Sequence, residues 1–127
     1  MLILATTIFF IFGLIIGSFL NVVIYRFNTH KSLGGRSGCM ACQSKLSWFE
    51  LIPVFSFVAL AGRCRTCKTK ISTQYPLVEI TTGIIFGALF CKFLDLFYTD
   101  VLTFSFGYSY YVTLFSILLV ITVYDIK

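Results

Sequence analysis

The sequence predicts an all-α polytopic membrane protein with about three transmembrane helices and a cytoplasmic four-cysteine loop between the first and the second. Two observations support this prediction. Hydrophobic residues make up 58% of the 127 residues and charged residues only 12%, whereas soluble domains carry about 25% charged residues. The apolar residues gather in three stretches, and most basic residues and two pairs of cysteines lie between the first two. A large water-soluble core is therefore not expected.

The first apolar stretch, residues 1–25, is predicted to be the first transmembrane helix. Residues 2–25 form a run of 24 positions without a charged side chain, and a helix needs about 20 residues to cross the hydrocarbon core. A cleaved signal peptide would begin with positive charge and carry a shorter apolar region. No lysine or arginine precedes Arg26, so this helix is expected to be retained.

The loop at residues 26–75 holds most of the positive charge. It contains eight of the ten lysines and arginines, and Glu50 is the only acid among them. Positive charge between spans is typical of the cytoplasmic side, so the N-terminus is predicted to lie outside. The charge also suits anionic lipid headgroups, whereas nucleic acid is not expected as a partner. The eight residues are Arg26, Lys31, Arg36, Lys45, Arg63, Arg65, Lys68 and Lys70.

Two further spans follow this loop. Residues 76–94 are predicted to be the second transmembrane helix, with Pro76 in the first turn, where a proline is well tolerated. Residues 95–100 are acidic and aromatic and are predicted to form an outer loop. Residues 101–125 are predicted to be the third helix, which places Lys127 on the cytoplasmic side, as the charge rule prefers.

Two glycine pairs mark helix faces, namely Gly13 with Gly17 and Gly83 with Gly87. Each pair has G-x-x-x-G spacing, which lets two membrane helices approach closely. Asn21 lies four residues after Gly17 and therefore shares its face. This face is predicted to pack against another helix, with Asn21 either bridging the helices or bordering a water-accessible site.

Four cysteines form the pattern C-x2-C-x21-C-x2-C in the loop. Two such C-x-x-C turns, called knuckles below, present four thiolates that can enclose a tetrahedral zinc ion. Basic residues beside the second knuckle favour the thiolate form. Disulfides and metal-free thiols remain as alternatives, although disulfides are rare in the cytoplasm. The lone Cys91 and His30 are not expected to be ligands. The predicted metal ligands are Cys39, Cys42, Cys64 and Cys67.

The apolar run inside residues 46–62 is about 12 residues long, too short to span. It is expected to lie along the membrane surface or beneath the knuckles, as a helix or a hairpin. Glu50 within it is expected either to pair with a nearby lysine or arginine, which is the simpler interpretation, or to serve a functional site.

Two acids, Asp125 and Glu79, lie at membrane edges. Ionisable groups in such positions are costly and are functional candidates. Acid catalysis would need two carboxylates close together, one ionised and one protonated, and no other internal pair is available. From its position alone, Asp125 is equally well explained as the point where the third helix meets the cytoplasm.

Several motifs together resemble the type IV prepilin peptidase family. They are "GSFLNVVIYR" at 17–26, "CMAC" at 39–42, "ELIPVFSFVALAGRCRTCKTKIS" at 50–72 and "QYPLVE" at 74–79. The resemblance covers nearly all of residues 13–79 and returns at Asp125. It implies a bacterial inner-membrane enzyme that cleaves the leader of prepilins or pseudopilins and N-methylates the new N-terminus.

The resemblance also implies roles for individual residues. The four cysteines match the family's tetracysteine motif, which is associated with zinc, and Asp125 matches the first of two catalytic aspartates. The second belongs to a Gly-x-Gly-Asp motif that is absent from these 127 residues, so this chain alone is expected not to cleave prepilin. S-adenosylmethionine is implied by the family only. The alternative is a non-enzymatic membrane zinc-binding scaffold of a pilus or secretion system.

Overall fold

The computed structural model describes residues 1–27, 37–39 and 41–126. It contains three helices that are long and apolar enough to cross a membrane: α1 (Leu2–Arg26), α3 (Gln74–Lys92) and α5 (Val101–Ile126). Four cysteines cluster between the first and the second of them. The predicted fold class is therefore confirmed. The expectations for Lys31, Arg36, His30 and Lys127 lie outside the described residues.

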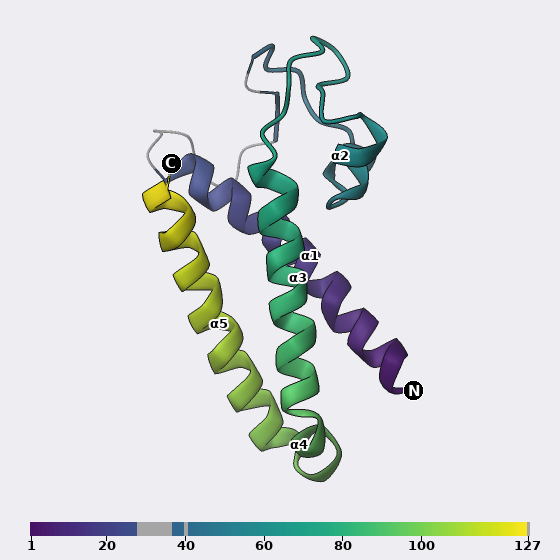
Figure 1. Ribbon diagram of the computed structural model, residues 1–127, viewed down its shortest axis with the longest axis vertical. Coiled ribbons are helices and arrows are strands. Elements are labelled where there is room, and N and C mark those ends of the chain that lie inside the picture. Colours follow the sequence, from purple (N-terminus) through teal and green to yellow (C-terminus); the bar gives the residue numbers. More distant parts are fainter. Residues whose placement is uncertain (28–36, 40, 127) are drawn as a thin grey trace.

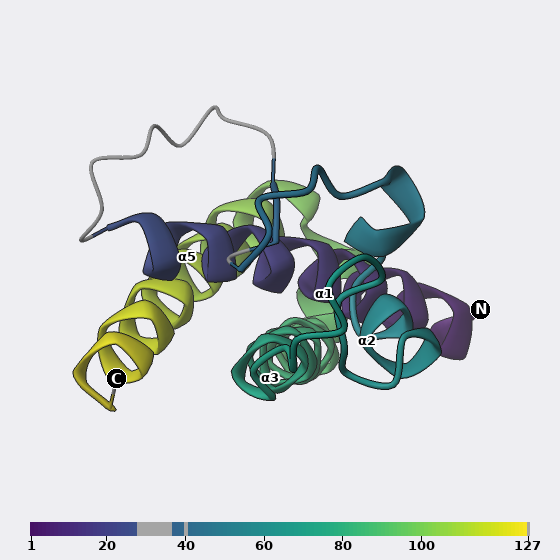
Figure 2. The same cartoon turned by 90° about the horizontal axis from the view of Figure 1, so that it is seen from above.

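The three long helices run in alternating directions, and α1 crosses α3 obliquely (Figure 1). The segment that carries the cysteines extends beyond the end where α1 finishes and α3 begins, and α5 finishes at the same end (Figures 1 and 2). The ring of Phe27, just after α1, lies 5.9 Å from that of Tyr124 in α5. The C-terminal end of α5 therefore lies on the same side of the bundle as the cysteines.

The α1–α3 crossing is very close because glycines occupy it. A Cβ atom added to Gly13 would lie 2.8 Å from the Cα of Gly83, and one added to Gly17 would lie 2.7 Å from the Cα of Glu79. These distances leave no room for a side chain between the backbones. Gly87 differs, because its nearest neighbours would be 3.8 Å away. The close approach therefore involves only one glycine of the second G-x-x-x-G pair.

The opposite end of the bundle is held by aromatic side chains. Phe90 is fully buried, stacks on Phe9 with ring centroids 4.3 Å apart and meets Phe104 edge to face. The hydroxyl of Tyr108 donates a hydrogen bond to the carbonyl oxygen of Phe86 at 3.1 Å. This bond satisfies a buried polar group within the aromatic cluster. Among the described residues of α5, only Phe104 and Tyr108 are buried, so α5 is anchored near its start.

The connector between α3 and α5 is helical, although the sequence analysis treats residues 95–100 as a loop. It forms α4 (Leu94–Thr99), and Asp100 lies between α4 and the start of α5 at Val101. The carboxylate of Asp100 accepts hydrogen bonds from the backbone N–H groups of Leu102 and Thr103 and from the Thr103 hydroxyl. The hydroxyl bond lowers the pKa of Asp100, because it stabilises the charged form. Asp100 thus caps α5.

The short apolar run between the knuckles forms two small helical pieces, η1 (Trp48–Leu51) and α2 (Phe55–Ala59). The alternative of a hairpin is therefore not what the structure contains. The guanidinium of Arg65, in the second knuckle, lies 5.4 Å from the centroid of the Phe49 ring, a cation–π distance. The short helices thus pack with the knuckles as one unit. We call residues 37–39 and 41–72 the cysteine module.

Candidate metal centre and adjoining cavity

The two knuckles repeat the same backbone hydrogen bonds. In the first, the Cys39 N–H donates to the Ser44 carbonyl at 3.0 Å, and the Gln43 N–H donates to the Cys39 carbonyl at 2.9 Å. In the second, the Cys64 N–H donates to the Thr69 carbonyl at 2.9 Å, and the Lys68 N–H donates to the Cys64 carbonyl at 3.1 Å. Each turn therefore holds its two cysteines in the same relative position.

The backbone conformation repeats as well. Gln43 and Lys68, each directly after the second cysteine of its knuckle, have φ values of 55° and 59°. This left-handed conformation is uncommon for residues other than glycine. The flanking residues of each turn pair as isolated antiparallel bridges, Gly38 with Lys45 and Arg63 with Lys70. The module therefore consists of two copies of one turn, and a shared function explains the repetition best.

The four cysteine sulfurs meet at one point between the knuckles. All lie within 4.8 Å of one another, with 3.6 Å between the Cys39 and Cys67 sulfurs and 4.0 Å between those of Cys42 and Cys64. Tetrahedral zinc with Zn–S bonds of about 2.3 Å would place its sulfurs roughly 3.8 Å apart. A disulfide would need about 2.05 Å, and all four cysteines are free thiols. The donor set could therefore hold a metal ion.

Hydroxyl groups support the second thiol of each knuckle. The Ser44 hydroxyl lies 3.0 Å from the Cys42 sulfur, and the Thr69 hydroxyl lies 3.2 Å from the Cys67 sulfur. These hydroxyls lower the pKa of Cys42 and of Cys67, because a donated hydrogen bond stabilises the thiolate. The backbone N–H of Cys67 lowers the pKa of Cys64 in the same way. Hydrogen bonds thus favour the thiolate form of these three cysteines. Cys39 differs, because burial and its contacts with the Cys64 and Cys67 sulfurs outweigh the backbone hydrogen bonds in its own turn and raise its pKa to about 11.

Replacing Thr69 with Val should weaken metal binding without removing a ligand. The change keeps the branched shape but removes the hydroxyl beside the Cys67 sulfur. Loss of a residue that supports a ligand typically costs 10–100-fold in metal affinity. A competition titration of zinc against a chromophoric chelator measures this. Thr66→Val, in the same turn, is the matched control and should bind zinc like the unmodified chain; equal affinity for both variants would contradict the role of the Thr69 hydroxyl.

The remaining residues singled out from the sequence lie apart from the sulfurs. Asp125 is exposed in the last turn of α5. Glu79 is buried in the α1–α3 crossing, and its carboxylate accepts a hydrogen bond from the Val54 N–H at 2.7 Å. Within the described residues, no hydrogen bond joins these two acids. Glu50 accepts a hydrogen bond from the Ser47 N–H at 2.7 Å and so closes a capping box at the start of η1.

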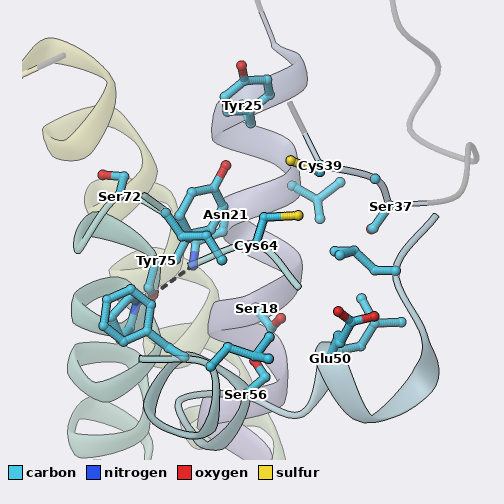
Figure 3. Close-up of a pocket in the computed structure, with 18 of the residues that line it drawn as sticks. Ser18, Asn21, Tyr25, Ser37, Cys39, Glu50, Ser56, Cys64, Ser72 and Tyr75 are labelled. Carbon is cyan, nitrogen blue, oxygen red and sulfur yellow. Dashed lines mark hydrogen bonds between the residues drawn. The ribbon is translucent and has the colours of Figure 1, made fainter. Parts of the chain in front are cut away.

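A cavity of about 410 Å³ lies between the cysteine module and the adjoining ends of α1 and α3. Figure 3 shows Ser18, Asn21 and Tyr25 along one helix, Tyr75 on another, and Cys39, Cys64 and Glu50 from the module around this space. Asn21 is only 3% exposed, and its side-chain N–H donates to the Tyr75 carbonyl at 2.9 Å. The structure therefore favours both possibilities left open for Asn21, since it bridges two helices and also borders a cavity.

The supporting hydroxyls and the contact between Glu79 and Val54 are not among the features predicted from the sequence. The hydroxyls could have been found from a pattern, because "CQSK" and "CKTK" share a Ser or Thr two residues after the cysteine. The contact between Glu79 and Val54 leaves no pattern in the sequence, since Val54 contributes its backbone N–H and lies 25 residues from Glu79. Val54 also has φ 57°, a strained conformation for a β-branched residue, which no local sequence pattern predicts.

Fold and site together define a polytopic membrane protein with a four-cysteine module of the metal-binding type. The chain belongs to the family described as the bacterial Peptidase A24 N-terminal domain, whose model matches residues 11–93. The resemblance stated from the sequence is thus confirmed. No solved structure matches the chain. The three spans and the bacterial relatives given next indicate an inner-membrane location.

Its curated relatives are prepilin-processing enzymes. The chain is 48% identical over 85 residues to the prepilin leader peptidase/N-methyltransferase of Myxococcus xanthus, an alignment that covers 66% of the chain and 25% of the relative. It is 41% identical over 88 residues to that of Bacillus subtilis, covering 68% of the chain and 36% of the relative. It is 34% identical over 102 residues to the prepilin leader peptidase/N-methyltransferase of Neisseria gonorrhoeae, an alignment that covers 61% of the chain and 36% of the relative. The chain thus spans about a quarter to a third of these relatives.

Proposed function

We propose that this chain is the N-terminal part of a membrane aspartic endopeptidase that cleaves the leader of prepilins or pseudopilins and N-methylates the new N-terminus. The observation that carries the proposal is the similarity to enzymes named for both activities. It extends over 66% of the chain in the Myxococcus xanthus comparison. Prepilin or pseudopilin is the proposed substrate, and the bilayer is the proposed environment of both substrate and enzyme.

The cysteine module is proposed to hold a structural zinc ion through Cys39, Cys42, Cys64 and Cys67. Four thiolates close a tetrahedral site with no open position for a substrate, so a structural role fits the donor set better than a catalytic one. The module would then act as a rigid body at the membrane face. Its two halves are separated by 21 residues in the sequence, and the ion would join them.

Asp125 is proposed to supply one carboxylate of a catalytic pair at the cytoplasmic membrane face. The N-terminus would then lie outside and the cysteine module inside. In support, the C-terminal end of α5, whose last turn contains Asp125, lies at the same end of the bundle as the module (Figure 1), and most basic residues lie between α1 and α3. The second aspartate would come from a Gly-x-Gly-Asp motif, which residues 1–127 do not contain. These residues alone are therefore proposed not to cleave prepilin.

N-methylation would require S-adenosylmethionine as the methyl donor. The names of the relatives support this proposal, and no motif in the sequence specifies the binding site. We therefore assign no residue of this chain to the methyl donor.

A chimera tests the role of Asp125. Residues 1–127 replace the corresponding part of the Myxococcus xanthus enzyme, and cleavage of a prepilin is followed by the shift in its mass in membranes. Asp125→Asn in this chimera is expected to reduce cleavage by at least about 100-fold, since an amide cannot activate water. Asp95→Asn, in α4 at the opposite end, is the matched control and should cleave normally. Full cleavage by Asp125→Asn would instead favour a zinc-binding scaffold.

A further inference from the structure

The short helix α2 is apolar on the side that faces away from the cavity. Phe55, Val58 and Ala59 share one face of this helix, at positions i, i+3 and i+4, and all three are exposed. Ser56 and Phe57 line the cavity instead. A helix on a water-exposed surface would show the reverse arrangement, with its polar side chains outside. The outer face of α2 therefore does not suit contact with water.

The preceding helix η1 extends this exposed apolar surface. The side chains of Trp48 and Phe55 are 78% and 65% exposed, and neither η1 nor α2 contains a buried residue. Residues 51–62 carry no charged side chain. So many neighbouring exposed apolar side chains mark an interaction surface. The large exposed apolar residues of this surface, called the apolar ridge below, are Trp48, Phe49, Leu51, Ile52, Phe55 and Val58.

A hydrogen bond fixes the depth of the ridge relative to α3. The Val54 N–H donates to the Glu79 carboxylate at 2.7 Å, and α2 lies beside the beginning of α3 (Figures 1 and 2). With 19 residues, α3 is about 28 Å long and only just crosses a hydrocarbon core of about 30 Å. A bilayer surface level with Glu79 would leave α3 about 10 Å too short to cross. Glu79 and Val54 therefore lie below that surface.

The position of α1 leads to the same depth. Gly17 packs against the Cα of Glu79, and the Ser18 side chain hydrogen-bonds to the Glu79 carboxylate. The first charged residue of α1 is Arg26, about 13 Å further along the helix axis. The carboxylate is therefore level with the interior of an uncharged membrane helix. The Val54 N–H that it accepts lies at this level too.

We propose that residues 48–59 form a re-entrant element, inserted into the leaflet of the bilayer on the side of the cysteine module, with the apolar ridge in contact with lipid. An apolar run too short to span is typical of such elements. Irregular backbone at membrane depth needs the protein to satisfy its polar groups. The Glu79 carboxylate does this for the N–H of Val54, the residue that precedes α2.

Basic and aromatic side chains beside the ridge match a layer of anionic headgroups. The guanidinium of Arg65 lies 5.4 Å from the centroid of the Phe49 ring, and this ring meets that of Trp48 edge to face at 5.9 Å. Tryptophan and arginine together are typical of segments that lie in the membrane interface. A second copy of this chain, with its net charge of +5, would instead bring like charges together. Lipid is therefore the partner that fits both the apolar and the basic side chains.

The test uses the whole chain, zinc-loaded, in vesicles of phosphatidylcholine and phosphatidylglycerol. Trp48 is the only tryptophan in the sequence, so Trp48→Phe combined with Phe55→Trp moves the single fluorophore onto α2. Lipids brominated in the upper part of their acyl chains are expected to quench its emission at least about twofold, and aqueous acrylamide should quench it little. Trp48→Phe with Thr66→Trp, in the second knuckle, is the matched control and should show the opposite pattern. Quenching of the α2 fluorophore by acrylamide alone, or by neither agent, would overturn the proposal, because the ridge would then face water or protein.

Further variants test the anchoring of the segment. Val58→Trp, on the same face of α2, is a second reporter that should behave like Phe55→Trp, and zinc content confirms that each variant folds. Glu79→Leu removes the acceptor of the Val54 N–H and is expected to make the α2 fluorophore at least about twofold more accessible to acrylamide. Glu50→Gln is the control, because the Glu50 carboxylate serves the capping box of η1. Equal accessibility in both variants would overturn the anchoring role of Glu79. None of these readouts depends on the proposed enzymatic activity.

Discussion

Removing zinc with a chelator is expected to unfold the cysteine module while the three long helices stay folded. In the described residues the module has no strand and only two short helices, too short to be stable alone. The four sulfurs of its two knuckles lie within 4.8 Å of one another. Structural zinc contributes an apparent ~10–16 kcal/mol in small zinc-finger peptides, which exceeds what the apolar contacts of such a small module can supply. The long helices have their own contacts.

Trypsin provides a direct measurement of this unfolding. Arg63, Arg65, Lys68 and Lys70 all lie in or beside the second knuckle, where a folded turn hinders access to the protease. With zinc bound, cleavage at these positions should be slow; after chelation it should be faster by at least about 100-fold, since protection depends on the population of the open form. The helical circular dichroism of the spans should change little, which would separate the module from the bundle.

Single cysteine variants give the matched comparison. Cys64→Ser removes the most buried of the four sulfurs and is expected to reproduce the effect of chelation. Cys91→Ser removes the fifth cysteine, which lies in α3 and outside the sulfur cluster, and should leave zinc content and trypsin resistance unchanged. If the module of the chelated chain resisted trypsin as well as the loaded one, its stability would have to come from the packing around Phe49 and Arg65 rather than from a metal.

The membrane helices could be predicted from the sequence because each of them depends only on the residues of its own segment. A run of uncharged residues long enough to cross the bilayer has few alternatives, so residues 2–25 identify α1 without knowledge of any contact. The knuckles follow for a similar reason, since the C-x-x-C spacing itself sets the geometry of each turn. Helix ends are less well determined. Gln74, for example, begins α3 two residues before the predicted start at Pro76.

The pairing of distant groups could not be read from the sequence. Asn21 and Tyr75 are 54 residues apart and meet only because α1 and α3 cross at glycines. Glu79 looked like a possible catalytic partner of Asp125 because both are acids at membrane edges. The crossing instead buries Glu79 against Val54 of the module, whereas Asp125 remains exposed on α5. Charge and spacing indicate which residues are unusual, but only the packing of helices shows what they face.

Gly17→Ala is expected to destabilise the helix bundle by about 2 kcal/mol, in the usual range for an overpacked contact. The added methyl group would lie 2.7 Å from the Cα of Glu79 and 3.0 Å from the Thr82 hydroxyl, and backbone atoms cannot turn away as a side chain can. Gly87→Ala is the matched control, because its methyl group would meet atoms no closer than 3.8 Å. Higher helix propensity should make that change neutral or slightly stabilising.

Unfolding of both variants in detergent micelles, followed by helical circular dichroism, measures the difference. The consequence of Gly17→Ala should extend beyond the bundle, since this contact sets the distance between the helices that carry Asn21 and Glu79. Moving α1 and α3 apart would lengthen the hydrogen bond from the Asn21 side chain to the Tyr75 carbonyl. It would also shift Glu79 relative to Val54. Equal stability of the two variants would show that α1 and α3 can separate at the crossing without a cost in unfolding free energy. The close glycine contact would then not be what positions the cavity.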